Sequence, residues 1–152
     1  FDTYIGVHGN FELMNGMHSY SDWVEKAKFL GIKALGICEK NTLASAFKFQ
    51  NACLKSDIRP IFGMEVTVYN EQKDVRYTVK LIVKDKEGWN NLLKINKILN
   101  VDEKTGVSCC LTRKHVCLKI SPYCQENGTI PITSLILWNT RRMTGIKNIL
   151  TI

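Results

Sequence analysis

The sequence predicts an α/β fold with mostly parallel strands. Over the first hundred residues, short apolar runs alternate with segments whose apolar residues recur at helical spacing. This alternation is typical of units in which helices join neighbouring parallel strands. With 152 residues, 45% of them hydrophobic, the chain is long enough to bury a core of its own. No pattern repeats at a fixed period, which argues against a repeat architecture.

The first strand and helix are predicted from an apolar run and a helix-start pattern. Residues 3–8 (TYIGVH) form the apolar run, and a loop rich in turn residues follows. Asp22 with Glu25 three residues later resembles a capping box, which predicts that a helix begins at Asp22. Gly31 predicts its end, and residues 33–38 then form an apolar run typical of a strand covered on both faces.

Two further helices and two further strands follow. Asn41 or Thr42 can cap a second helix, and residues 61–69 alternate as a strand. Residues 75–83 alternate in the same way, and a third helix is predicted to open at Gly88. The residues that follow helical spacing are Ala46, Phe47, Cys53 and Leu54 in the second helix and Leu92, Leu93, Asn96 and Leu99 in the third.

The pattern decays in the last third of the chain. We therefore divide the sequence into an α/β segment of residues 1–100 and an irregular continuation of residues 101–152, in which residues 130–138 could form a strand. Four of the six cysteines lie in this continuation with His115, but their spacing lacks the paired pattern of zinc sites. We expect reduced, unliganded thiols. The four are Cys109, Cys110, Cys117 and Cys124.

The charge indicates a basic surface without a marked binding stripe. Lys and Arg total 21 against 14 Asp and Glu, giving a net charge of +7 without any run of five or six like charges. Weak, nonspecific attraction to DNA is therefore expected at most. No apolar stretch is long enough to span a membrane and no secretory signal is recognisable, which predicts a cytoplasmic protein without membrane contact. The chain begins with Phe1 rather than Met, which suggests a piece of a longer protein.

The segment from Ala27 to Glu65 carries the most specific pattern. It runs as helix, Gly stop, buried strand, polar loop, helix and strand. This order resembles the first half of a PHP domain, the polymerase and histidinol phosphatase module at the front of bacterial DNA polymerase III alpha subunits. The resemblance covers roughly the first hundred residues. It implies a distorted (β/α) barrel that is incomplete here, because closed α/β barrels take about 250 residues.

The resemblance also implies where a metal site would lie, at strand ends that carry His, Asp, Glu and Cys ligands in the family. Two matching positions keep a good ligand, namely His8 and Glu65 in Gly63-Met64-Glu65. The substituted positions are Gly6 for the first His of His-x-His, Asn15 for an Asp, Glu39 and Lys40 for an Asp-His pair, and Thr78 for a His.

The substitutions imply a degenerate metal site and no catalytic residues in this segment. Even one catalytic ion needs about three protein ligands, so no cofactor is expected; a retained ion would be zinc, manganese or magnesium. His8 and Glu65 then have structural alternatives, as a hydrogen-bonded histidine and a solvent-facing acid. Lys40 is expected near Glu65 or Glu39, where its ammonium would replace the charge of the cations.

These observations lead to a hypothesis for function. The chain is interpreted as the N-terminal PHP-type segment of a DNA polymerase III alpha-like replicative polymerase, with a structural and partner-docking role in DNA replication. Nucleotidyl transfer would belong to the parent DNA-directed DNA polymerase, and the expected partners are the polymerase body and a proofreading exonuclease.

Two alternatives stay open, a free-standing PHP-type metal-dependent phosphoesterase and a small basic nucleic-acid-binding protein that uses residues 109–124. A Ser-His-Asp hydrolase and a nucleotide-binding fold are disfavoured, because the sequence lacks G-x-S-x-G, G-x-G-x-x-G and P-loop motifs. Aromatic residues at helical spacing are expected to serve core packing rather than base stacking. They are Trp23, Phe47, Phe49 and Trp89.

Overall fold

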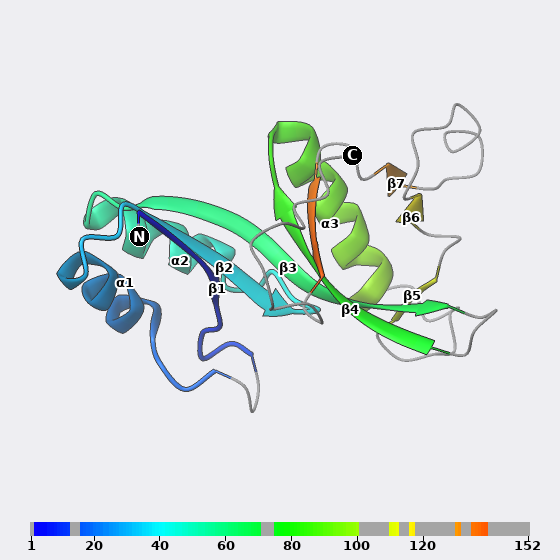
Figure 1. The fold of residues 1–152 in the computed structure, drawn as a ribbon, viewed down its shortest axis with the longest axis horizontal. Helices are drawn as coiled ribbons and strands as arrows, with labels where there is room; N and C mark the ends of the chain where they lie inside the picture. Colours follow the sequence, from blue (N-terminus) through cyan, green and yellow to red (C-terminus); the bar gives the residue numbers. More distant parts are fainter. Residues whose placement is uncertain are drawn as a thin grey trace. The chain divides into compact units, whose positions relative to one another are not determined.

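The chain divides into two compact units, Phe1–Met64 and Glu65–Ile152 (Figure 1). The computed structural model describes residues 2–12, 16–70, 75–100, 110–112, 116–117, 130–131 and 135–139. No helix within these ranges is long and apolar enough to cross a bilayer.

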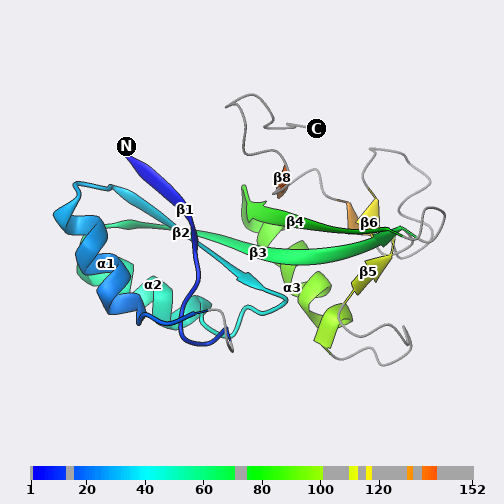
Figure 2. The same cartoon turned by 60° about the horizontal axis from the view of Figure 1, so that its bottom comes forward.

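The first unit is built from parallel strands with two helices on one face. Strand β1 (Thr3–Val7) pairs in parallel with β2 (Ala34–Lys40), and β2 is followed in the sheet by β3 (Arg59–Asn70). Helices α1 (Tyr20–Phe29) and α2 (Ala46–Lys55) lie on the same face of these strands (Figure 2). One apolar cluster fills the space between the helices and the strands, made of Val7, Tyr20, Val24, Ala27, Leu35, Ile37, Phe49, Cys53 and Ile58.

Helix α1 begins earlier than the sequence pattern predicted. Ser19 is the N-cap, and its hydroxyl accepts a hydrogen bond from the Asp22 backbone N–H at 3.3 Å while Asp22 Oδ2 accepts one from the Ser19 N–H at 3.1 Å. Asp22 is therefore the third residue of the helix within a capping box, and Ser19 is the N-cap. The predicted stop at Gly31 is confirmed, because Gly31 adopts φ of 70° directly after the C-cap.

Helix α2 begins at Ala46, several residues after the predicted caps Asn41 and Thr42. Its N-cap residue, Ser45, makes no side-chain capping bond. The hydroxyl of Ser45 donates instead to Glu39 Oε2 at 2.5 Å. A tertiary contact has thus replaced the local cap.

The buried face of α2 also differs from the prediction. Phe49 and Cys53 are buried, whereas Phe47 is 71% exposed and Leu54 is exposed as well. Residues four apart, Phe49 and Cys53, therefore define the core face of this helix.

Gly6 interrupts the regular pairing of β1 with β2. The register shifts between Ile5 and Val7, and Gly6 has φ of 122°. Side chains of L-residues rarely adopt this backbone conformation, whereas glycine adopts it readily. The backbone conformation of β1 at position 6 therefore requires glycine.

We expect Gly6→Ala to lower the free energy of unfolding by about 1–3 kcal/mol, the range for a side chain held in a strained backbone conformation. Urea denaturation measures this change. Gly31→Ala is the matched control, since a Cβ at Gly31 meets no atom within 4 Å and only the positive φ is costly. If Gly6→Ala lowers the free energy of unfolding no more than Gly31→Ala does, the strained backbone conformation assigned to Gly6 would be contradicted.

The second unit continues β3 into a sheet with the order β3-β4-β8. Strand β4 (Val75–Val83) pairs antiparallel with β8 (Leu135–Asn139), and β5 (Cys110–Thr112) pairs in parallel with β3. Two short strands, β6 (Val116–Cys117) and β7 (Ile130–Pro131), pair in parallel with each other. Helix α3 (Lys86–Asn100) precedes β5 along the chain.

Most elements of the second unit follow the sequence prediction. Strand β4 has the predicted bounds, but where one strand was predicted within 130–138 the structure has two, β7 and β8, in different sheets. Helix α3 begins two residues before Gly88, because Asp85 Oδ1 accepts a hydrogen bond from the Gly88 N–H at 2.8 Å. Leu92 is buried as predicted, but Leu93 is 43% exposed. The α/β fold with mostly parallel strands is confirmed.

Candidate functional site

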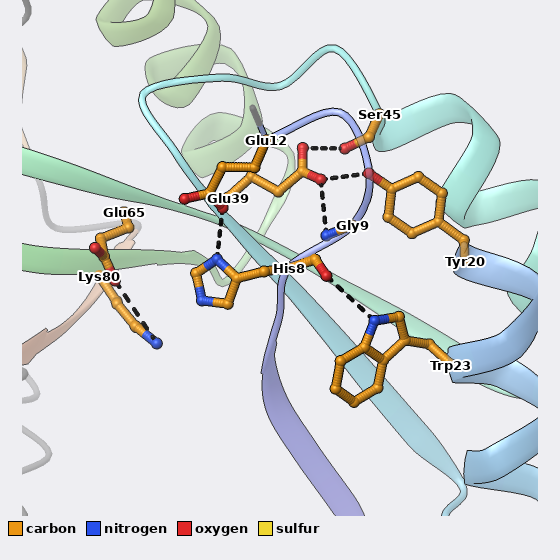
Figure 3. Close-up of polar contacts among 9 residues, drawn as sticks. All are labelled: His8, Gly9, Glu12, Tyr20, Trp23, Glu39, Ser45, Glu65 and Lys80. Carbon is orange, nitrogen blue, oxygen red and sulfur yellow. Dashed lines mark hydrogen bonds and ion pairs between the residues drawn. The ribbon is translucent and has the colours of Figure 1, made fainter. Parts of the chain in front are cut away.

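The ends of β1 and β2 bring together residues that are distant in sequence. His8 and Gly9 follow β1, and Glu39 is the second-last residue of β2. Carboxyl ends of parallel strands lie at one edge of a sheet, the usual place for sites in α/β folds. The N-terminal part of α1 and Ser45, before α2, border the same edge (Figure 3).

Glu39 is the centre of a buried hydrogen-bond network (Figure 3). Its side chain is 1% exposed, and Oε1 accepts hydrogen bonds from the Gly9 backbone N–H at 3.1 Å and from the Tyr20 hydroxyl. Its other oxygen, Oε2, accepts from the Ser45 hydroxyl. Three donors thus stabilise a carboxylate that would be costly to bury alone.

Glu39 reaches this network because of strand alternation. Leu35, Ile37 and Glu39 share one face of β2, and the first two pack in the core beneath the helices. Lys40 therefore points to the opposite face, where it is exposed.

The structure leaves no space for a side chain at position 9. A Cβ on Gly9 would lie 2.0 Å from the nearest atom of the Tyr20 ring. Glycine thus allows the backbone N–H and the phenol to approach the same carboxylate oxygen.

His8 has a carboxylate partner that the sequence analysis missed. Its Nδ1 lies 2.6 Å from Oε2 of Glu12, which is buried, while the His8 ring is partly exposed. The Glu12 N–H donates to the Gly9 carbonyl at 3.1 Å, and this turn returns the glutamate to the histidine. The spacing His-x-x-x-Glu in a turn-rich loop is the signal that could have identified the pair. His8 is thus a hydrogen-bonded histidine in this structure.

Burial raises two pKa values around this site. Burial and the hydrogen bond to Glu39 raise the pKa of the Tyr20 phenol well above its ordinary value of 10.0. Burial alone raises the pKa of the Cys53 thiol from 9.0 to about 11. Both groups are therefore held in their neutral forms in the folded protein.

These shifts predict that stability decreases in alkaline solution. The unfolded chain releases the Cys53 proton near pH 9, whereas the folded chain retains it until about pH 11. The stabilisation is therefore complete below pH 9 and is lost as the pH rises through about 11. We expect the free energy of unfolding to fall between about pH 9 and about pH 11, and to fall less steeply in Cys53→Ala. Equal slopes in urea denaturation of the two proteins would contradict this assignment.

Glu65 is paired within the second unit. Its Oε2 lies 3.8 Å from Nζ of Lys80 on β4, and both side chains are mostly buried (Figure 3). The expectation that Lys40 would pair with Glu65 or Glu39 is therefore corrected. Lys80 supplies the cation for Glu65, and hydroxyl and N–H donors occupy Glu39.

The other positions matched to the family are placed as follows. Gly6 lies in the irregular part of β1, and Thr78 is half-buried on β4. Asn15 lies outside the described residues, as do Cys109, His115 and Cys124. Cys110 and Cys117 fall in β5 and β6.

The described side chains do not fit a metal centre. Within the ranges that the structure describes, no three His, Cys, Asp or Glu residues are grouped to hold an ion. Glu39, near the end of β2, already has hydrogen-bond donors as partners, and Glu65, in the middle of β3 rather than at a strand end, has the ammonium of Lys80. These hydrogen bonds connect the loop after β1 to β2, to α1 and to Ser45.

Comparison with known proteins gives the family. A family model of the PHP domain matches residues 5–116. DNA polymerase III subunit alpha of Bacillus subtilis is 29% identical over 106 residues, which cover 69% of this chain and 10% of that protein. The same subunit of Staphylococcus epidermidis is 32% identical over 107 residues, covering 69% of this chain and 10% of that protein. The chain spans about a tenth of the length of these curated relatives.

Two solved structures show a more distant likeness. An amidohydrolase from Chromobacterium violaceum is 13% identical with a TM-score of 0.49, covering 71% of this chain and 40% of that chain. A two-domain protein from Bacteroides vulgatus, containing a predicted PHP-like metal-dependent phosphoesterase, is 14% identical with a TM-score of 0.42, covering 84% of this chain and 41% of that chain. These values are too low to bear on function. Because the PHP match includes well over half of the sequence, the chain belongs to the PHP domain family.

Proposed function

We propose that this chain is the N-terminal PHP-type segment of a DNA polymerase III alpha-like replicative DNA polymerase. Its role is to stabilise the polymerase and to dock partners, and it has lost the hydrolytic site. The similarity to two alpha subunits over 69% of the chain supports the assignment. Nucleotidyl transfer then belongs to the rest of the parent protein, and the partners are the polymerase body and a proofreading exonuclease.

The hydrogen bonds to Glu39 are the main observation that supports the proposed loss of hydrolytic activity. Glu39 stands where the resemblance places a metal-ligating Asp, yet both of its oxygens accept hydrogen bonds from protein donors. A carboxylate that turned toward a cation would leave the Tyr20 and Ser45 hydroxyls without their acceptor. Because unsatisfied buried polar groups are costly, the network opposes metal binding.

Two neighbouring substitutions support the same conclusion. Lys40 replaces the next expected ligand with an exposed side chain on the face of β2 opposite to Glu39, so this position supplies no ligand beside Glu39. Gly6 replaces the first His of the family pattern in a backbone conformation that disfavours any side chain. Restoring ligands would therefore require changes in β1 as well as in β2.

A phosphodiesterase assay tests the loss of hydrolysis. We expect the purified chain with added Mn²⁺ to hydrolyse bis(p-nitrophenyl) phosphate no faster than its His8→Ala and Glu39→Ala variants. Hydrolysis by the wild type that both substitutions remove would support the free-standing phosphoesterase instead.

The size of the native protein tests the parent assignment separately. An antibody against this chain should detect, in cells of its source, a polypeptide several times larger than 17.4 kDa. Detection of only a 17.4-kDa protein would contradict the polymerase assignment, whatever the assay shows.

A further inference from the structure

Strand β1 has an open edge that no charged residue protects. Among the strands that the structure describes, β2 is the only neighbour of β1. The Asp2 carbonyl accepts a hydrogen bond from the Ala34 N–H of β2 at 3.1 Å. Because backbone groups alternate in direction along a strand, those of Thr3 and Ile5 point away from β2. Edge strands are commonly protected by lysine or proline, and the β1 sequence TYIGV contains neither. The edge is therefore able to accept a further strand.

An apolar surface of α1 borders this edge. Trp23 packs partly against the core, as its helical spacing predicted, and its Nε1–H donates to the His8 carbonyl after β1 at 3.2 Å (Figure 3). Its ring is stacked with that of Tyr4, with centroids 6.2 Å apart and an interplanar angle of 16°. Tyr4 is 45% exposed, and Leu30, two turns after Trp23 on the same side of α1, is 57% exposed. Apolar side chains thus remain in contact with water along the open edge.

The charged groups of this surface balance each other. A cleft of about 370 Å³ beside the helix is lined by His18, Asp22, Trp23 and Lys26. It contains one acid and one base, four residues apart on α1, and the Lys26 ammonium also lies 5.2 Å from the centre of the Phe29 ring. A two-fold axis across such a surface places the acid of one copy opposite the base of the other. The surface is therefore complementary in charge to a second copy of itself.

We propose that two copies of this chain pair through β1, antiparallel, about a two-fold axis at Tyr4. Thr3 then lies opposite the partner's Ile5, and the two residues exchange both of their outward backbone hydrogen bonds. Tyr4 lies opposite the partner's Tyr4, because Thr3 and Ile5 flank it symmetrically. Cross-strand pairs of aromatic and of β-branched residues stabilise antiparallel strands, and no like charges oppose each other within the paired segment.

The same axis brings the two α1 helices into contact. The core cluster packs α1 over both β1 and β2, so each helix lies about one strand spacing from the two-fold axis. The two helices are then about 10 Å apart, which is a normal packing distance. Asp22 faces the partner's Lys26 twice, by symmetry, and Trp23 and Leu30 leave contact with water. This inference goes beyond the proposed function and does not depend on the polymerase assignment.

Sedimentation of the full chain tests the association. We expect the weight-average mass to rise with protein concentration from 17.4 kDa towards twice that value. A mass of 17.4 kDa at every accessible concentration would overturn the proposal and leave the edge of β1 to a strand of a different protein.

A proline at the first residue of β1 tests the backbone pairing. Thr3→Pro removes an outward N–H at a position where a strand tolerates proline. Each dimer then loses two symmetry-related hydrogen bonds, so we expect the dissociation constant of the dimer to rise by about fivefold or more. Circular dichroism and thermal melting establish that the variant is folded. An unchanged dissociation constant would place the contact on another surface and overturn the proposal.

Exchange of the two charges tests the orientation of the helices. Lys26→Glu and Asp22→Lys each place like charges opposite one another, so we expect either variant alone to dimerise at least about fivefold more weakly than the wild type. A mixture of the two variants should recover the dimer, because opposite charges then meet again. Lys28→Glu, which makes the same charge change on the opposite side of α1, should dimerise like the wild type. A mixture no more dimeric than its two components would overturn the proposed pairing.

Discussion

Replacing Glu39 with alanine should lower the free energy of unfolding by about 3–5 kcal/mol. The substitution leaves the Gly9 N–H and the hydroxyls of Tyr20 and Ser45 without their shared acceptor in the protein interior. Each unsatisfied buried donor costs about 1–3 kcal/mol, and water that enters the space reduces the sum. Chemical denaturation near neutral pH measures the loss.

Two comparisons make this prediction specific to the network. Glu25→Ala removes an exposed acid from α1 and should change the free energy of unfolding by less than about 0.5 kcal/mol. Tyr20→Phe should cost less in the Glu39→Ala background than in the wild type, because the hydroxyl has then lost its acceptor. Additive effects of the two substitutions would show that Glu39 does not organise this site.

Replacing Phe49 with alanine should lower the free energy of unfolding by about 3–5 kcal/mol. Phe49 is fully buried and contacts two other rings edge-on, with centroids 6.0 Å from Tyr20 and 6.3 Å from Phe62. Its removal leaves a cavity beneath the residues that hold Glu39. Thermal and urea denaturation should both report the loss.

Phe47 provides the matched control on the same helix. Its side chain is 71% exposed, so Phe47→Ala should change the free energy of unfolding by less than about 0.5 kcal/mol. The pair also tests the rotation of α2 about its axis. A larger cost for Phe47→Ala than for Phe49→Ala would place the opposite face of the helix in the core.

Local sequence patterns were sufficient to predict most elements of the fold. The strict alternation in residues 75–83 predicted β4 with its bounds, and Gly31 predicted the end of α1. Helix starts were less reliable, because Ser19 and Asp22 both begin a pattern that fits a capping box. The sequence pattern alone does not distinguish a cap from the third helical residue.

The face of α2 was mistaken for a related reason. Phe47 and Phe49 are both large and apolar, and each fits a helical period with residues further along the chain. Packing against Tyr20 decides between them, and that contact joins residues distant in sequence. The start of α2 was missed because Ser45 donates to Glu39 instead of capping the helix.

The sequence indicated the strand ends at which polar residues gather, but not the hydrogen-bond partners of those residues. His8 follows β1 and Glu39 lies near the end of β2, the strand ends at which loops gather polar residues in parallel sheets. The partners of Glu39 were not predicted, since the Gly9 N–H and the Tyr20 hydroxyl come from residues 30 and 19 positions away. Lys80 was missed as the partner of Glu65 because an ion pair between strands has no local sequence signal.

The metal content of the purified chain tests the central claim most directly. If hydrogen bonds at Glu39 and the substitutions at Gly6 and Lys40 have replaced the metal site, elemental analysis should find no stoichiometric zinc, manganese or iron. Two or more tightly bound transition-metal ions per wild-type chain would contradict the claim.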